Sequence, residues 1–190
     1  MNNQITKKNT VEFLKKYGYI VALSVILIAV AVTLAIVANL PDNEEDVVVP
    51  PITFYNPILN ATVAKEFSNS TLLWNSTLRQ WEAHKAVTFT VPTAADVHAV
   101  LDGTVQEVFS NFLEGTVVVI RHANNLTTRY SSLNANVDVE VGDEVRRGEV
   151  IGRASNSANG ELNLGTHLRF QVLENGTPVN PAEFLNLEVK

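Results

Sequence analysis

Near its C-terminus the chain reads Gly165-Thr166-His167-Leu168-Arg169-Phe170, and this stretch decides the fold. Side chains two residues apart on a β-strand point the same way, so we expect His167 and Arg169 to share one face of a strand. A glycine turn at Glu174-Asn175-Gly176 and the pair Asn180-Pro181 follow. The stretch therefore predicts a strand that presents a histidine and a fixed cation side by side.

The composition places the chain among globular proteins. It has 190 residues, of which 46% are apolar and 18% charged, and a net charge of −6. That length allows one ordinary domain plus something smaller. The acidic balance argues against nucleic acid as the main partner. Because the sequence has no cysteine, disulfides and thiolate metal sites are excluded, and only histidine, aspartate and glutamate remain as zinc ligands.

A transmembrane helix is predicted over residues 19–40. The run from Tyr19 to Leu40 carries no charge and is long enough to cross the roughly 30 Å hydrocarbon core. Lysines precede it and acidic residues follow it, so we expect residues 1–18 in the cytosol and the C-terminal body outside. A cleaved signal peptide is the alternative, suggested by Ala29-Val30-Ala31. That motif lies inside the apolar run, however, and the run is longer than a usual signal core.

Residues 41–61 are predicted to form a linker. They begin with an acidic run and continue with Val47-Val48-Val49, after which Pro50, Pro51 and Pro57 occur. Consecutive prolines stiffen a chain and exclude a helix. We therefore expect an extended connection between the membrane helix and the body.

Residues 62–83 are predicted to form an amphipathic helix that leads into the body. Leu73, Trp74, Leu78 and Trp81 recur there at roughly helical spacing, with charged residues between them. Such an aromatic stripe is most simply core packing, and a partner-binding helix is the alternative.

From residue 97 onward the apolar period changes to two. The predicted strands are residues 97–101, 104–109, 116–122, 127–133, 150–152 and 167–173. Asp102-Gly103 is a turn signal between the first two. Residues 137–145 alternate valines with acids until Gly142-Asp143 interrupts them. Short strands with glycine turns predict a mainly β, antiparallel domain over residues 84–190.

Several segments in order resemble the LytM (lysostaphin-type) zinc metallopeptidase family over about residues 80–187. The matching positions outside the active site are Val97, Ala99, Gly103, Thr104, Val105, Val139, Gly142, Asp143, Val145, Gly148, Ile151 and Gly152. Lipoyl and biotinyl carrier domains have a pattern like the last seven positions, but the chain has no attachment lysine motif of theirs. The resemblance implies the LytM fold.

The resemblance also implies where an active site would lie. His84 matches the family's first zinc ligand, Thr88 stands in place of the aspartate ligand, and Arg169 stands in place of the second histidine ligand. His167 matches one catalytic histidine, and Ser132 replaces the other within Tyr-x-Ser-Leu. These five positions are the expected remnant of a peptidase site.

We expect no metal, no cofactor and no catalytic residue in this remnant site. A hydrolytic zinc needs three protein ligands and an open position for water. Threonine is a poor ligand, and the arginine side chain has no lone pair and repels a dication. His98 and His122 match no family ligand and are expected to be structural. Arg169 is expected to hold the old cleft together, by pairing with a carboxylate or with His84 and His167.

A narrower resemblance is to anchored LytM proteins of endospore-forming Firmicutes. It rests on the short N-terminal tail, the single anchor, Tyr-x-Ser-Leu, the Trp81–Val87 segment and Glu161 ahead of Gly165. It implies a scaffold in the forespore membrane that binds a mother-cell membrane protein of the stage III sporulation protein AH type during engulfment and channel assembly. Peptidoglycan is a further candidate partner. The alternatives are a regulator of a cell-wall amidase and an active zinc endopeptidase.

Overall fold

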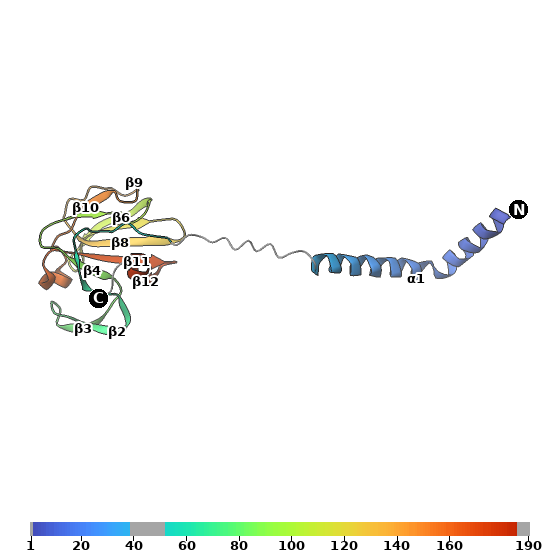
Figure 1. The fold of residues 1–190 in the computed structure, drawn as a ribbon, viewed down its shortest axis with the longest axis horizontal. Helices are drawn as coiled ribbons and strands as arrows, with labels where there is room; N and C mark the ends of the chain where they lie inside the picture. The colour runs from blue at the N-terminus through green and yellow to red at the C-terminus, as the bar shows by residue number, and fades with distance from the viewer. Residues whose placement is uncertain (1, 39–51, 186–190) are drawn as a thin grey trace. The chain divides into compact units, whose positions relative to one another are not determined.

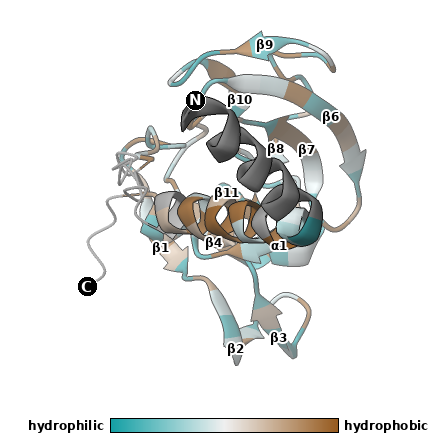
Figure 2. Ribbon diagram, turned by 90° about the vertical axis from the view of Figure 1, so that its right-hand side faces the viewer, coloured by the Kyte–Doolittle hydropathy of each residue, from teal (hydrophilic) through white to brown (hydrophobic). Residues whose placement is uncertain are grey.

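The computed structural model describes residues 2–38 and 52–185, which belong to two compact units. The first unit is the helix α1 (Asn2–Ala38). Within it, Lys16–Ala35 is long and apolar enough to cross a membrane. Apolar side chains such as Leu27 and Ile28 are exposed along this segment, which is brown in Figure 2. The predicted helix is confirmed as far as Ala38, and the last two residues of the predicted span lie outside the described residues.

The second unit, here called the body, begins at residue 52 and consists mainly of β-strands (Figure 1). Its elements in chain order are β1 (Thr62–Lys65), β2 (Ser68–Asn75), β3 (Gln80–His84), β4 (Val87–Thr90), β5 (Asp96–His98), β6 (Gly103–Asn111), β7 (Gly115–Arg121), β8 (Leu126–Leu133), β9 (Glu144–Val145), β10 (Val150–Arg153), η1 (Asn159–Leu164), β11 (His167–Glu174), β12 (Thr177–Val179) and η2 (Pro181–Glu183).

One large sheet carries most of the body. Its strand order is β1-β4-β11-β8-β7-β6-β9, with β12 paired to β11, and each pairing is antiparallel. Two smaller antiparallel sheets pair β10 with β5 and β2 with β3. The predicted mainly β, antiparallel architecture is confirmed. Because β11 lies in the middle of the large sheet, the stretch that begins at His167 has a strand on either side.

The core consists of apolar and aromatic side chains from the strands. The β-branched run of β7 is almost wholly buried, as expected for a central strand. Tyr130 on β8 and Phe170 on β11 are fully buried with ring centroids 5.3 Å apart. The Tyr130 hydroxyl accepts hydrogen bonds from the backbone N–H of Val100 at 3.0 Å and from the Thr128 hydroxyl at 3.2 Å. The tyrosine of the Tyr-x-Ser-Leu motif is thus a core residue.

The predicted linker is too long at its C-terminal end. Residues 52–61 belong to the body, since Phe54 stacks on Phe184 with ring centroids 4.8 Å apart and Ile58 forms an isolated bridge with Val97. Phe54 and Ile58 are 5% and 3% exposed. Burial of these two apolar side chains stabilises the packing of residues 52–61 against the rest of the body. Residues 41–51 of the predicted linker lie outside the described residues.

The predicted helix over residues 62–83 is wrong, because this segment forms β1, β2 and most of β3. The side chain of Asn75 explains part of the difference. Its Oδ1 accepts hydrogen bonds from the backbone N–H groups of Thr77 and Leu78, at 2.9 and 3.0 Å. This local turn competes with a helix. It joins β2 to β3, so Trp74 pairs with Trp81 across two strands and the helix-like spacing is incidental.

Two further strand predictions need correction. The strands on either side of Asp102-Gly103 do not pair with each other, since β5 pairs with β10 and β6 pairs with β7 and β9. Just after β5, the backbone N–H of Ala99 donates a hydrogen bond to the Glu149 carbonyl at 2.8 Å, next to β10 and not to β6. In the valine and acid alternation of residues 137–145, only Glu144–Val145 is a strand.

Candidate functional site

Strand β11 places His167 and Arg169 on one face at the middle of the large sheet. Arg169 lies between Thr88 on β4 and Ser131 on β8, which are its register partners. His167 is fully buried, whereas the Arg169 side chain is 28% exposed. The aspartate-like position and the second ligand-like position are therefore neighbours across two strands, as the family resemblance implies.

A buried carboxylate, that of Glu161, organises this face. Glu161 lies on the 3-10 helix η1 and its side chain is 3% exposed. Lys65 Nζ donates a hydrogen bond to Oε1 at 2.9 Å, and Thr88 Oγ1 donates one to Oε2 at 3.4 Å. Arg169 Nη1 lies 4.0 Å from Oε2. One carboxylate thus faces two cations from two strands.

Both predicted histidines point at the same carboxylate. His84 Nδ1 lies 3.9 Å from Oε1 of Glu161, and His167 Nε2 lies 3.9 Å from Oε2. The other ring nitrogens are held in place, with His84 Nε2 3.0 Å from Thr88 Oγ1 and His167 Nδ1 2.7 Å from the Gly165 carbonyl oxygen. Because a carbonyl oxygen only accepts, His167 Nδ1 carries a proton, and Nε2 is the ring nitrogen that faces Glu161.

The electrostatics favour a charged glutamate beside a neutral histidine. Burial raises the pKa of Glu161, but the charges of Arg169 and Lys65 outweigh burial and hold this pKa below its ordinary value. Burial, together with the Arg169 charge, lowers the pKa of His84 to about 4. The expected pairing of Arg169 with a carboxylate has this physical form, and Glu161 is the carboxylate.

Ser132, which stands in place of a catalytic histidine of the family, forms hydrogen bonds with Ser155. Its Oγ donates a 2.9 Å hydrogen bond to the Ser155 carbonyl oxygen, and Ser155 Oγ returns one to the Ser132 carbonyl at the same distance. The Ser155 carbonyl also accepts from the backbone N–H of His167 at 2.9 Å. Ser132 has φ +67°, a conformation that side-chain-bearing residues seldom adopt and that is often found at functional sites.

Zinc, the metal that the family resemblance implies, does not fit these residues. Thr88 and Arg169 replace two of the three ligands, and Lys65 adds a second cation at the same carboxylate. Two fixed positive charges beside the site oppose binding of a dication. Among residues 2–38 and 52–185, no group of three or more histidine, aspartate or glutamate side chains is arranged to hold a metal ion.

A small cleft opens beside the Glu161 cluster. Its volume is about 240 Å³, and Glu161 and Arg169 contribute to its lining. The side chain of Leu78, from the turn between β2 and β3, and that of Leu113, from the turn between β6 and β7, contribute to its apolar walls. The cleft therefore reaches the remnant site at Arg169 and its ion-pair partner Glu161.

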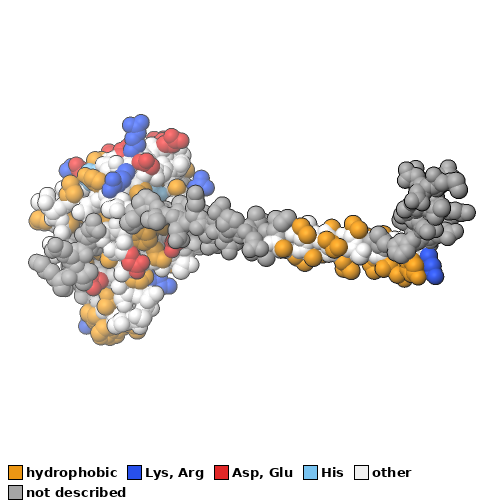
Figure 3. Space-filling view, turned by 45° about the vertical axis from the view of Figure 1, so that its right-hand side comes forward, with side chains coloured by type: hydrophobic (Ala, Val, Ile, Leu, Met, Phe, Trp, Pro, Cys, Tyr) orange, Lys and Arg blue, Asp and Glu red, His pale blue; other side chains and the backbone are white. Residues whose placement is uncertain are grey.

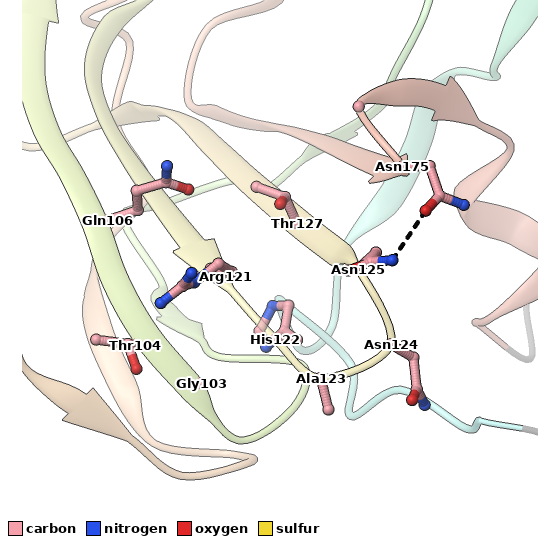
Figure 4. A pocket seen from close by; sticks show the side chains of 11 residues that line it. Gly103, Thr104, Gln106, Arg121, His122, Ala123, Asn124, Asn125, Thr127 and Asn175 are labelled. Carbon is pink, nitrogen blue, oxygen red and sulfur yellow. Dashed lines mark hydrogen bonds between the residues drawn. The ribbon is translucent and has the colours of Figure 1, made fainter.

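A larger polar groove of about 790 Å³ lies at the other end of the same strands (Figure 4). Figure 4 shows Arg121 extending toward β6, opposite Asn125, which donates a 3.0 Å hydrogen bond to Asn175. His122 lines this groove but is 7% exposed. Its ring contacts the Asp102 carbonyl oxygen at 2.9 Å and Thr128 Oγ1 at 2.6 Å. Burial lowers the pKa of His122. His122 thus links the turn before β6 to strand β8.

His98 also lies away from the remnant site. Its Nδ1 is 3.0 Å from the Gly148 carbonyl oxygen, and the Tyr55 ring meets it edge-on at a centroid distance of 5.4 Å. His98 therefore holds β5 against the turn before β10, and neither it nor His122 joins the cluster around Glu161.

Comparison with known proteins shows the family to which the chain belongs. The sequence model of the family described as "Peptidase family M23" matches residues 82–181, which are more than half of the chain. The chain belongs to peptidase family M23. Over 94 residues it is 37% identical to stage II sporulation protein Q of Bacillus subtilis (strain 168). The aligned region covers 50% of this chain and 32% of that protein. Over 104 residues it is 35% identical to the DD-carboxypeptidase/endopeptidase Mpg of Neisseria meningitidis, covering 55% of this chain and 23% of that one.

Solved structures give the same picture for the body. One described as the SpoIIQ-SpoIIIAH pore forming complex matches with a TM-score of 0.63 and 26% identity, over 72% of this chain and 92% of the solved one. A second SpoIIIAH and SpoIIQ complex matches with a TM-score of 0.60 and 28% identity, over 70% and 99%. The LytM-like fold is therefore confirmed. The solved chains correspond almost entirely to the body, whereas the chain spans about a third or less of the curated relatives' length.

The sequence interpretation missed the roles of Glu161 and Lys65. Lys65 fell within a predicted helix, and Glu161 was only one feature of a resemblance. One signal did exist, because Glu161 is the single charged residue in the segment 154–168, which is otherwise rich in serine, asparagine and glycine. A lone charge next to a site motif needs a partner when the loop is buried. The sequence does not show that this partner is Lys65.

Proposed function

We propose that this chain is a membrane-anchored, catalytically inactive M23-family protein that acts as an interaction scaffold in sporulation. In this proposal α1 anchors it in the forespore membrane with the N-terminus in the cytosol. The body lies between the two membranes and binds a mother-cell membrane protein of the SpoIIIAH type. His84, Thr88, Ser132, His167 and Arg169 are then the remnant of a peptidase site.

One observation carries the loss of catalysis in this proposal. Glu161 is ion-paired to Lys65 at 2.9 Å and lies 4.0 Å from Arg169, the residue that stands at one of the family's zinc-ligand positions. A metal-activated water needs an open coordination position on a bound cation. Here two protein cations take the place of a metal ion beside the carboxylate, so the cluster would offer no bound metal to activate water.

The scaffold role is supported by two relatives solved in complex with SpoIIIAH. The body also offers a free strand edge. β9 covers only Gly103 and Thr104 of the nine-residue β6, so among the described residues no strand pairs along that side of residues 106–111. An exposed edge can add a strand from a partner through backbone hydrogen bonds. A membrane anchor would keep the body at the surface that faces such a partner and raise its effective concentration there.

Loss of catalysis is tested with purified full-length protein. We expect less than about 0.1 equivalent of zinc per chain by metal analysis, because a catalytic zinc site needs three ligands. We also expect no release of fragments from peptidoglycan after zinc is added. Stoichiometric zinc together with peptidoglycan cleavage would establish the active endopeptidase instead. An M23 endopeptidase with an intact ligand set serves as the positive control.

The partner is tested by capture from sporulating cells. The tagged full chain, solubilised in detergent, is expected to retain a membrane protein of the SpoIIIAH type. Recovery of a cell-wall amidase without any mother-cell membrane protein would favour the amidase regulator and contradict the scaffold. A variant that carries Glu107→Lys on the free edge of β6 provides the matched comparison. Loss of capture by this variant would locate the interface at that edge.

A further inference from the structure

The β2–β3 hairpin has two different faces. Its inner face carries Asn75, which is 2% exposed and donates hydrogen bonds to the Gly160 carbonyl at 3.0 Å and to Glu82 Oε1 at 2.8 Å. In addition, Thr77 Oγ1 accepts from the backbone N–H of Asn163 at 3.1 Å. Polar contacts therefore fix the hairpin to η1 through one face.

The outer face of the same hairpin is apolar and exposed. Trp74 and Trp81 are register partners whose ring centroids lie 5.5 Å apart, and they are 46% and 64% exposed. Leu72, two residues before Trp74, is 55% exposed. Hydrophobic side chains gather at the lower end of the body in Figure 3, where Figure 1 places the hairpin. An exposed aromatic cluster of this kind marks a contact surface.

The chain itself indicates which surface lies within reach. Residues 39–51 (13 residues) separate α1 from the body, and at about 3.5 Å per residue they hold the body within about 50 Å of the end of the helix. Whatever bilayer contains α1 is therefore always available to the hairpin at high effective concentration. Within the part of the chain that the structure describes, nothing keeps a protein partner within reach of the hairpin in the same way.

The chemistry of the outer face suits a bilayer surface. Tryptophan side chains concentrate at membrane–water interfaces, where the ring is buried and its N–H stays hydrated. Exposed Arg79 at the hairpin turn and exposed Lys85 after β3 add positive charge. Of the two acidic groups nearby, Glu66 is exposed, and Glu82 is engaged by Asn75 and Gln80. Basic residues beside interfacial aromatics favour anionic headgroups.

We propose that the outer face of the β2–β3 hairpin, formed by Leu72, Trp74 and Trp81, docks into the headgroup region of the bilayer that holds α1. This inference rests on the membrane anchor of the proposed function. Docking would fix the orientation of the body on its own membrane, with the hairpin toward the lipid and the rest of the body free to meet a partner.

Intrinsic fluorescence tests the proposal directly, because the chain has 2 tryptophans and both lie on this face. The full chain is reconstituted in vesicles of phosphatidylethanolamine and phosphatidylglycerol, and its insertion is checked by flotation. Vesicles with brominated acyl chains are expected to quench the emission at least about twofold relative to unbrominated vesicles, because an interfacial ring lies about 5–10 Å into the headgroup and acyl boundary. Emission should also shift to shorter wavelength.

Two variants sharpen the test while keeping both tryptophans. Leu72→Glu places a charge on the docking face and should abolish most of the quenching. Phe112→Glu changes an aromatic side chain that is 76% exposed on the turn between β6 and β7, and should leave quenching unchanged. Far-ultraviolet circular dichroism confirms that each variant is folded.

The outcomes separate the two proposals. A chain that floats with the vesicles but shows no quenching overturns hairpin docking and leaves the anchor intact. Equal quenching in the wild type and Leu72→Glu also overturns it. A chain that does not float overturns the membrane anchor, and docking is rejected with it.

Discussion

Lys65 and Glu161 lie 96 residues apart in the sequence, yet Lys65 Nζ donates a 2.9 Å hydrogen bond to Glu161 Oε1. The pair joins the edge strand β1 to the 3-10 helix η1, beside Thr88 and Arg169 of the remnant site. Lys65 is 13% exposed and Glu161 3% exposed, so solvent screens this pair less than a surface ion pair. This ion pair is the polar centre of the cluster around Glu161.

Substituting Glu161→Gln should destabilise the isolated body, residues 52–190, by about 2–4 kcal/mol, because it leaves two partly buried cations without a counter-charge. Denaturant unfolding followed by circular dichroism gives the difference. The matched control is Glu174→Gln at the exposed end of β11, which should change stability by less than about 0.5 kcal/mol. Equal stability of Glu161→Gln and wild type would contradict a stabilising role for the cluster.

The same variant should show a characteristic pH dependence. The pKa of Glu161 is lower in the folded protein than its ordinary value of 4.5. Its charge therefore stabilises the fold above that pH, and the contribution is lost as the pH falls through the folded pKa. The stability difference between wild type and Glu161→Gln should shrink as unfolding is measured at successively lower pH below about 4.5. A difference that stays constant down to acid pH would oppose this account.

His84→Gln should flatten the pH dependence of stability between about pH 6.5 and 4. Burial lowers the pKa of His84 to about 4 in the folded body from 6.5. As the pH falls through this range, the unfolded chain gains a proton that the folded chain does not, so wild-type stability falls, by at most about 3 kcal/mol from this residue. Unfolding free energies of both proteins at several pH values give the two slopes. Identical slopes would contradict a buried neutral His84.

Restoring two family ligands should create a zinc site. In the double variant Thr88→Asp and Arg169→His, the new side chains are register partners on β4 and β11. His84 Nε2 already lies 3.0 Å from Thr88 Oγ1, and one of the two cations is removed. We expect about one equivalent of zinc per chain by metal analysis, since three ligands suffice for a zinc with an open position. The single variant Thr88→Asp keeps Arg169 and should bind none. Zinc binding by Thr88→Asp would show that Arg169 is not the obstacle.

Tyr130→Phe should destabilise the body by about 1–3 kcal/mol, because it removes the acceptor of a buried backbone N–H. The Tyr130 hydroxyl accepts from Val100 N at 3.0 Å, and burial raises the pKa of the phenol. Tyr55→Phe, at a half-buried tyrosine that packs on His98 through its ring, is the control. Denaturant midpoints of the two variants give the comparison, and equal midpoints would show that the hydroxyl contributes little.

Local periodicity predicted the strands well where each had an apolar face to bury. β7, β8 and β11 follow the predicted ranges closely because their alternating or β-branched residues enter one core. The prediction failed over residues 62–83, where Trp74 and Trp81 face outward and no core imposes a period. There the turn that Asn75 caps decides the structure. Hydrophobic spacing is informative only when the spaced residues share a buried surface.

The sequence by itself determined the β fold, an apolar helix at the N-terminus and the substituted positions Thr88, Ser132 and Arg169. Those features depend on residue type and short spacing. Only the tertiary structure decided the contacts of Glu161, because Lys65, Glu161 and Arg169 come from three separate segments, namely β1, η1 and β11. It also decided that both tryptophans lie on an exposed face. Contacts between segments that are distant in the sequence set these arrangements, since they place Glu161 beside Lys65 and attach one face of the hairpin to η1. Local spacing does not encode such contacts.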